Sequence, residues 1–146
     1  MEIFLGSIER CLVCPENTDY TSNPLTRDHI IPVKTGKDHR LVLSTIVKSQ
    51  ENFARLCIRD HQLVDRMKLS RYRQQGLIGL SDYIAYDYPK SPDPQIRDMQ
   101  ERQFLRLLMM FQDSLTELNG QTPKELREGY LRAIDHLDSI IFKIKR

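Results

Sequence analysis

The sequence contains no run of about 18 apolar residues, the length that a membrane-spanning helix requires. Residues 1–6 have neither the basic segment nor the long apolar segment of a secretory signal peptide. Internal repeats and tracts of low complexity are also missing. These absences predict a soluble, cytoplasmic protein that does not contact a membrane.

A strong excess of one charge is lacking as well. The 22 basic and 20 acidic residues leave a formal net charge of +2, and the isoelectric point is about 8.5. This balance does not by itself identify a nucleic-acid-binding protein. Because 40% of the 146 residues are hydrophobic, the chain can bury a core as one domain, or as a compact domain with an appendage.

Cysteines are few, and their number argues against a disulfide framework. The chain has three, which is an odd number, and two of them form the tight pair Cys11-Leu12-Val13-Cys14. Such pairs in intracellular proteins hold a metal ion more often than they form disulfides. The cysteine pattern therefore favours a metal site.

Three prolines lie close together between residues 88 and 94, and a continuous helix or central strand cannot run through them. We therefore place a boundary here. The expected organisation is an N-terminal domain over residues 1–88, a linker over residues 89–94 and a C-terminal part over residues 95–146.

The N-terminal domain gives weaker signals of secondary structure. Residues 29–33 are mostly apolar and β-branched, and they suit a short strand. Residues 40–47 suit either a strand or a helix, because hydrophobic periodicity does not distinguish the two. From about residue 59 to residue 73, a polar stretch with Leu63 and Met67 four residues apart predicts a helix after the last cysteine.

The C-terminal part has apolar residues at helical spacing in two stretches, which predicts an antiparallel helical hairpin. The turn is expected at Asn119-Gly120. The following Thr122-Pro123-Lys124-Glu125 is typical of a capping box with proline at the first helical position. The two stripes are Phe104, Leu107, Leu108, Phe111, Leu115 and Leu118, and then Leu126, Tyr130, Ala133, Ile134, Leu137, Ile141 and Ile144.

Leu105, Met109 and Met110 widen the apolar face of the first of these helices. Two interpretations remain open. The extra residues either pack onto the N-terminal domain, or they form the interface of a homodimer or a complex with another protein, for which methionine-rich faces are well suited.

Four short motifs follow one another in the N-terminal domain: Cys11-x2-Cys14, then Thr26-Arg27-Asp28-His29-Ile30-Ile31-Pro32, then Asn52, then Cys57-x2-Asp60-His61. In this order they resemble the HNH endonuclease family, whose pattern runs Cys-x2-Cys, Asp-His-Ile-x-Pro and Asn-x3-Leu-Cys-x2-Cys-His. The likeness covers roughly residues 11–68, which is less than half of the chain. It implies an α+β fold in which a small ββα-metal domain, similar to a treble clef, precedes the helical hairpin.

Hydrolysis of a phosphodiester needs an activated water and stabilisation of the negative charge that develops. A neutral imidazole can accept the water's proton near neutral pH, and the resemblance assigns this general-base role to His29. It also implies that Asp28 and His61 hold a catalytic Mg²⁺, Mn²⁺, Ni²⁺ or Zn²⁺ ion. Asp65 is a candidate third ligand, because it follows His61 by four residues and so shares a helical face with it.

If Asp28 and His29 lie on a strand, their side chains point to opposite faces, so the two residues must divide the labour. Asn52 matches the central asparagine of the family, which implies that it holds His29 in a productive orientation. We therefore count His29, Asn52 and His61 as the catalytic set.

The chain departs from the family at the structural zinc site. Many members have a second Cys-x2-Cys pair, whereas this chain has Cys57-x2-Asp60. Aspartate can ligate zinc, so Cys11, Cys14, Cys57 and Asp60 form a possible structural site. The alternatives are a three-cysteine site completed by another residue or by water, and a knuckle without a metal.

Basic residues gather after the expected strand and along the expected helix. Their usual explanation is a solvated surface, but a nuclease must also neutralise phosphates beside its site. The candidates for phosphate contact are Lys34, Lys37, Arg40, Arg55, Arg59, Arg66, Lys68, Arg71 and Arg73.

The resulting hypothesis is a metal-dependent endonuclease that cuts DNA, with RNA not excluded, of the kind used in host-defence and mobile-element systems. One alternative is a non-catalytic nucleic-acid-binding module that keeps the zinc knuckle without turnover. Another is an interaction subunit of a larger complex, in which the helical hairpin is the functional part.

Overall fold

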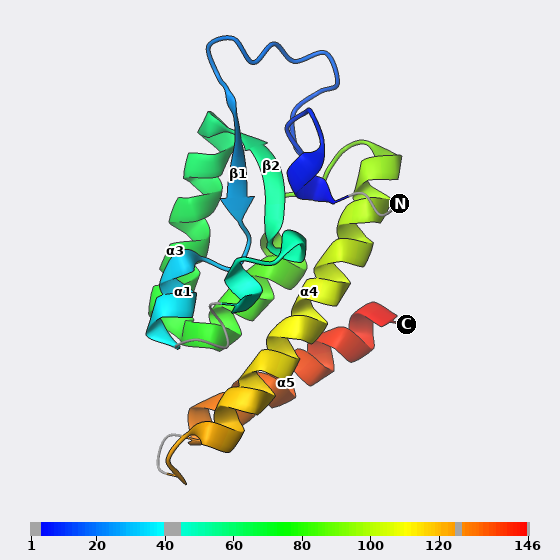
Figure 1. Cartoon of the computed structure of the whole chain (residues 1–146). Coiled ribbons are helices and arrows are strands. Elements are labelled where there is room, and N and C mark those ends of the chain that lie inside the picture. The colour runs from blue at the N-terminus through cyan, green and yellow to red at the C-terminus, as the bar shows by residue number, and fades with distance from the viewer. Residues whose placement is uncertain (1–3, 40–44, 125–126, 146) are drawn as a thin grey trace.

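The structure is a computed structural model that describes residues 4–39, 45–124 and 127–145. Within these residues the fold combines helices with one two-stranded antiparallel sheet (Figure 1). The elements follow in this order: η1 (Leu5–Ser7), β1 (Leu25–His29), α1 (Val33–Asp38), η2 (Gln50–Asn52), β2 (Phe53–Cys57), α3 (Ile58–Asp82), the single π-turn η3 (Tyr83–Asp87), α4 (Pro94–Gln121) and α5 (Arg127–Lys145).

The sheet is short, and α3 continues directly from it. β1 and β2 pair so that His29 lies opposite Phe53 and Leu25 lies opposite Cys57. Since β2 ends at Cys57 and α3 begins at Ile58, no loop separates the strand from the helix, and α3 packs alongside the sheet (Figure 1). Side chains from the start of α3 therefore lie close to those of β1.

The position predicted for the first strand is wrong. The strand ends at His29, where we had expected it to begin, and Pro32 is instead the N-cap of α1. Proline has no N–H for a strand ladder, and the backbone of Ile31 is bonded to the side chain of Asn52. In the ambiguous stretch, residues 45–47 are helical, and residues 40–44 lie outside the described residues.

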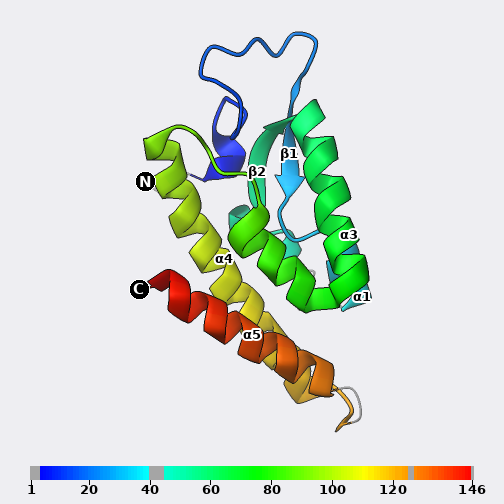
Figure 2. The ribbon, with the colours of Figure 1, turned by 180° about the vertical axis from the view of Figure 1, so that it is seen from behind.

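The helix predicted over residues 59–73 is confirmed, and it extends further along the chain. Its regular backbone breaks at Gly76, which has φ 63° and ψ −146°. Figure 2 shows the chain turning sharply at the end of the first segment of α3 and running back toward the start of α4. A backbone of this kind is open to glycine and strained for other residues.

The two C-terminal helices pack against each other with opposite directions, as the hairpin predicted (Figures 1 and 2). The expected turn at Asn119-Gly120 is wrong, because α4 continues to Gln121. Thr122 ends that helix by donating its hydroxyl to the carbonyl of Leu118. Glu125, the partner in the expected capping box, lies outside the described residues. No described helix combines the length and the apolar composition needed to cross a membrane.

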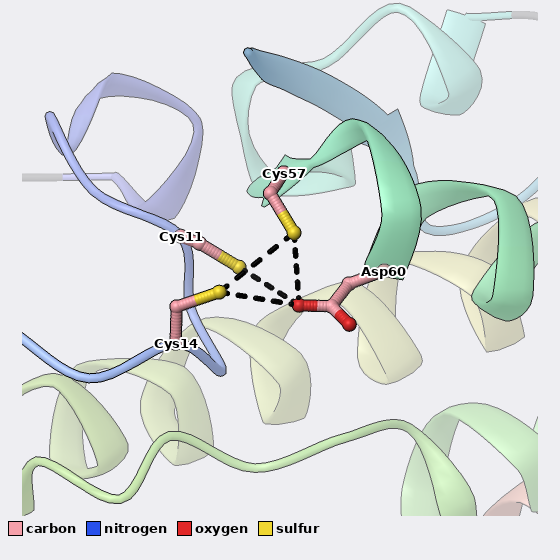
Figure 3. Close-up of side chains that lie close together, drawn as sticks. All are labelled: Cys11, Cys14, Cys57 and Asp60. Carbon is pink, nitrogen blue, oxygen red and sulfur yellow. Dashed lines mark hydrogen bonds between the residues drawn. The ribbon is translucent and has the colours of Figure 1, made fainter. Parts of the chain in front are cut away.

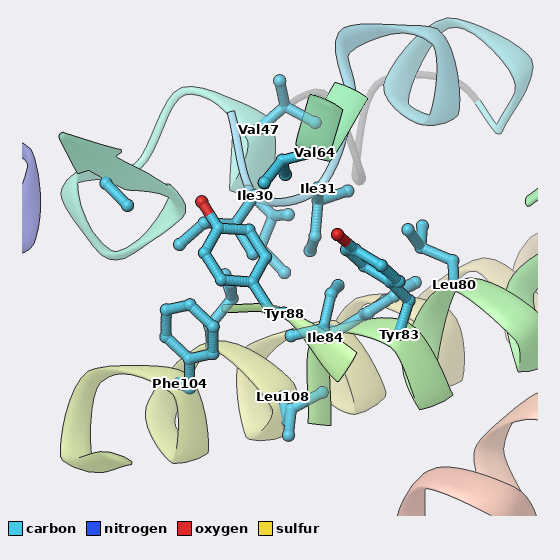
Figure 4. Packing of buried hydrophobic residues seen from close by; sticks show 14 of the residues in the cluster. Ile30, Ile31, Val47, Val64, Leu80, Tyr83, Ile84, Tyr88, Phe104 and Leu108 are labelled. Atoms are coloured by element: carbon cyan, nitrogen blue, oxygen red, sulfur yellow. The ribbon is translucent and has the colours of Figure 1, made fainter. Parts of the chain in front are cut away.

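The buried hydrophobic residues form one cluster that includes both the N-terminal domain and the C-terminal helices. Figure 4 shows Phe104 and Leu108 of α4 facing a layer of Tyr83, Ile84 and Tyr88, with the residues around Ile30 on the other side of that layer. Of the residues that widen the face of α4, Leu105 and Met110 pack against this cluster. Met109 is 37% exposed.

One polar side chain of α4 also joins the two parts. Gln103 is buried, and its amide nitrogen donates to the carbonyls of Glu51 and Phe53, each at 2.9 Å. Its amide oxygen accepts from the N–H of Leu5 at 2.8 Å. These bonds fix α4 against the sheet at positions that hydrophobic packing alone would leave free to slide.

The break at Gly76 predicts opposite effects of alanine at two glycines. Gly76→Ala should lower the free energy of unfolding by about 1–2 kcal/mol, because alanine must adopt a left-handed φ there. Gly120→Ala should leave it unchanged or raise it by up to about 1 kcal/mol, because Gly120 is helical with open space around its missing Cβ. Urea unfolding followed by circular dichroism measures both, and equal effects would contradict the prediction.

Candidate functional site

The three cysteines and Asp60 meet at one end of the sheet. Cys11 and Cys14 lie at the start of the long loop before β1, Cys57 is the last residue of β2, and Asp60 is in the first turn of α3. Figure 3 shows the four side chains pointing toward a common centre. Asp60 Oδ2 lies 3.3 Å from Sγ of Cys11, 3.4 Å from Sγ of Cys14 and 3.0 Å from Sγ of Cys57.

These separations fit the coordination shell of a zinc ion. Tetrahedral zinc with Zn–S near 2.3 Å and Zn–O near 2.0 Å places sulfurs about 3.8 Å apart and a sulfur about 3.5 Å from the oxygen. Sγ of Cys14 lies 3.7 Å from Sγ of Cys57, and all four ligand atoms lie within 4.8 Å of one another. The cluster can therefore bind a metal ion with only a small expansion of the sulfur–oxygen distances.

The electrostatics of this cluster also suit a cation. Burial raises the pKa of the Cys11 and Cys14 thiols. Burial opposes the charge of Asp60 too, but hydrogen bonds from the three thiols outweigh it and lower the pKa of that carboxyl. Oδ2 of Asp60 thus accepts hydrogen bonds from three thiols. A single cation can take the place of the three protons once the thiols deprotonate.

A second group of possible ligands lies where β1 faces α3. Nε2 of His61 is 3.3 Å from Oδ1 of Asp28 and 3.3 Å from Oδ2 of Asp65, and the three groups lie within 4.8 Å of one another. The side chain of Asp28 is fully buried, whereas those of His61 and Asp65 are 24% and 45% exposed. The residues predicted as catalytic metal ligands are therefore together, with access from solvent through His61 and Asp65.

Thr26, which our sequence analysis did not single out, orients the imidazole of His61. Its hydroxyl donates to the carbonyl of Leu56 at 2.8 Å, and its oxygen lies 2.7 Å from Nδ1 of His61. Because the hydroxyl proton goes to the carbonyl, the oxygen is left to accept from Nδ1–H. Nε2 is then directed at the two carboxylates, and the hydrogen bond to Asp28 raises the pKa of His61.

Asp28 is enclosed by two further donors that the motif did not indicate. Nζ of Lys68 lies 2.5 Å from Oδ1 of Asp28, and the hydroxyl of Tyr88 donates to Oδ2 at 2.7 Å. Although burial opposes the charge of Asp28, hydrogen bonds from His61, Lys68 and Tyr88 keep the pKa of the carboxyl low. Lys68 was predicted to contact phosphate, but its side chain is only 1% exposed, so a role at the protein surface does not hold for this residue.

His29 lies at the end of β1 and points away from Asp28. As expected for neighbours on a strand, Asp28 contacts α3 while the ring of His29 lies against that of Phe53 on β2 in a tilted arrangement, with ring centroids 4.7 Å apart. Burial lowers the pKa of His29. The negative charge of Asp28 raises this pKa and the positive charge of Lys68 lowers it, but the net shift is downward. The imidazole is therefore neutral at neutral pH, as a general base must be.

Asn52 supports the segment that follows His29. Its amide oxygen accepts from the N–H of Ile31 at 2.6 Å, and its amide nitrogen donates to the carbonyls of Ile31 and Val47. The side chain is buried, and the backbone carbonyl of Asn52 accepts from the N–H of Ile30. Asn52 therefore fixes the backbone that follows His29, and a positioning role for it would be exerted through that backbone.

The remaining basic candidates are dispersed. Lys34 pairs with Asp38 on α1, and Arg71 pairs with Asp87. Arg55 donates Nε to the carbonyl of Ile8, and Arg40 lies outside the described residues. The other candidates are exposed: Lys37, Arg59, Arg66 and Arg73.

Two basic residues that line a cavity beside Phe53 were missed by the sequence analysis. Arg27 shares the face of β1 that carries His29, and its guanidinium lies 4.9 Å from the centroid of the Phe53 ring. Arg27, Lys48 and Phe53 are among the residues that line a shallow cavity of about 370 Å³. Side chains alternate between the two faces of a strand, so a strand placed correctly at residues 25–29 would have put Arg27 and His29 on one face.

Comparisons of the sequence with family models and with curated proteins, and of the fold with solved structures, found no match.

The cysteine cluster predicts a bound metal ion. We expect purified protein to contain about one zinc ion per chain by elemental analysis. Cys57→Ser should lose the ion and unfold at a lower temperature, because one ligand of a closed site is removed. Asp60→Cys is the matched control and should retain the ion, since a fourth thiolate completes a common zinc-ligand set. Unchanged zinc content in Cys57→Ser would contradict this assignment.

The bonds of Asn52 predict a large loss of stability on its removal. Asn52→Ala should lower the free energy of unfolding by about 2–4 kcal/mol, because it leaves buried backbone groups of Ile31 and Val47 without partners. Asn17→Ala, at an exposed loop position, is the control and should change it by less than about 0.5 kcal/mol. Equal denaturant midpoints for the two variants would contradict a stabilising role for these hydrogen bonds.

Proposed function

We propose that this chain is a metal-dependent nuclease of the HNH type that hydrolyses phosphodiester bonds in DNA, with RNA as a further possible substrate. The observation that carries the proposal is the meeting of Asp28, His61 and Asp65, with His29 at the neighbouring position of β1. A strand pair followed at once by a helix that brings in His61 supports a ββα-metal arrangement.

Asp28, His61 and Asp65 would hold the divalent ion. When bound, such an ion stabilises the charge that develops on the phosphate and the leaving oxygen. Two carboxylates and an imidazole suit a hard or borderline divalent cation, and the exposed side of Asp65 leaves room for water and phosphate.

His29 would take the proton from the attacking water. Its depressed pKa supports a neutral imidazole at neutral pH, and Asn52 restrains the backbone that follows it. Base catalysis of this kind contributes a factor of about 10² to 10⁴ to the rate. The zinc cluster would act structurally, because it joins the N-terminal loop to the strand–helix junction that presents Asp28 and His61.

The surface around His29 supports an anionic substrate. Arg27 and Lys48 line the shallow cavity next to Phe53, so a phosphate near His29 would meet positive charge. A homodimer or protein partner could be bound by α5, on which Leu131 and Ile144 are 47% and 38% exposed.

One observation favours the alternative of a non-catalytic binding or interaction module. The carboxylate of Asp28 already has a positive partner in Lys68, so the fold does not need a metal ion at this position to neutralise the buried charge. On this alternative the zinc cluster and the basic surface would remain, and substitution of His29 would change no activity.

A nicking assay on supercoiled plasmid separates the two. With Mg²⁺, Mn²⁺, Ni²⁺ or Zn²⁺ present, wild-type protein should nick the plasmid, and His29→Ala should reduce the rate at least about 100-fold. Excess chelator should abolish the reaction. His136→Ala is the matched control, because His136 pairs with Asp82 in another part of the fold. Equal rates for wild type and His29→Ala would reject the nuclease and favour the binding module.

A further inference from the structure

Lys68 is a buried cation at the centre of the proposed metal site. Its side chain is only 1% exposed, and Nζ lies 2.5 Å from Oδ1 of Asp28 and 3.2 Å from Oδ1 of Asp65. Nζ also donates to the carbonyl of His29. A lysine is almost never buried to this extent unless its charge is paired, so the two carboxylates are what keep Lys68 in the core.

The positive charge of Lys68 is held by the atom that a metal ion would need. Oδ1 of Asp28 faces both Nζ of Lys68 and Nε2 of His61, whereas Oδ2 accepts from Tyr88. A divalent ion bound about 2.1 Å from Oδ1 could lie no more than about 4.6 Å from Nζ, given the 2.5 Å between Nζ and Oδ1. Like charges this close repel strongly in a buried site.

We infer that Lys68 is an internal competitor of the divalent ion, which shares Asp28 and Asp65 with it and thereby lowers the affinity of the site for metal. The inference rests on the metal site of the proposed function and adds a residue that sets its affinity. Lys68 acts on the site through its ion pairs with the two carboxylates. To bind, the metal ion must either displace Nζ from Oδ1 of Asp28 or overcome the repulsion between the two positive charges.

Lys68 could instead have the opposite effect and strengthen metal binding. If Lys68 served only to hold the carboxylate of Asp28 in a conformation suited to metal, its removal would weaken metal binding. The sign of the change in affinity therefore decides between competition and support.

The experiment measures Mn²⁺ binding by electron paramagnetic resonance and by calorimetry, on the full chain with zinc already supplied. Lys68→Gln removes the charge and keeps a donor that can reach Asp28. We expect its dissociation constant for Mn²⁺ to be at least tenfold lower than that of wild type. Lys90→Gln is the matched control, because it removes the charge of an exposed lysine outside the site, and we expect less than a twofold change.

An unchanged or higher dissociation constant in folded Lys68→Gln overturns the inference, as does the absence of Mn²⁺ binding from both proteins. If Lys68→Gln does not fold, wild-type protein labelled with ¹⁵N-lysine gives the answer. A buried ammonium exchanges slowly, and its signal should shift during a Mg²⁺ titration with the midpoint found by calorimetry. A signal that stays constant while Mg²⁺ binds overturns the inference.

These readouts do not depend on catalysis. If Lys68→Gln binds Mn²⁺ more tightly than wild type does, and wild type nicks no plasmid, the competition is supported and the nuclease is rejected. A protein that nicks plasmid and shows no effect of Lys68→Gln on Mn²⁺ affinity rejects only the competition.

Discussion

The central constraint in this molecule is the burial of one carboxylate. Asp28 has no exposed surface, and a buried charge that loses its partner destabilises a protein by about 3–5 kcal/mol. The chain meets this requirement with donors from separate segments: His61 and Lys68 on α3, and Tyr88 after η3. Each of these segments is therefore held at a fixed distance from β1.

The same requirement links the two parts of the chain. Tyr88 lies at the edge of the proline-rich stretch that we had read as a linker, yet it is buried and its hydroxyl donates to Asp28 of β1. Its ring also packs edge-on against Phe104 of α4. A single side chain thus connects the candidate site to the C-terminal helices, and the packing of α4 becomes part of what holds Asp28 in place.

The sequence could predict what depends on local pattern. Helical periodicity located α4, α5 and the first segment of α3, and short motifs placed Cys57 near Asp60 and His61 near Asp65. The role of Lys68 could not be predicted, because its partner Asp28 is 40 residues away in sequence and a lysine in a polar helix usually faces solvent. The strand was misplaced because Ile30 and Ile31, which looked like strand residues, are apolar since they are buried in the core outside the strand. The N–H of Ile31 donates to the side chain of Asn52 and not to a neighbouring strand.

Contacts from the N-terminal loop, α3 and α4 have a further effect on the two edges of the sheet. On β2, Gln103 donates to the carbonyl of Phe53 and the N–H of Leu12 donates to the carbonyl of Arg55. On β1, Lys68 donates to the carbonyl of His29. Unpaired strand edges are the usual templates for intermolecular pairing and amyloid growth. At these positions a third strand from another molecule would find the carbonyl acceptors already in use, so we expect these contacts to disfavour pairing of the sheet with another molecule.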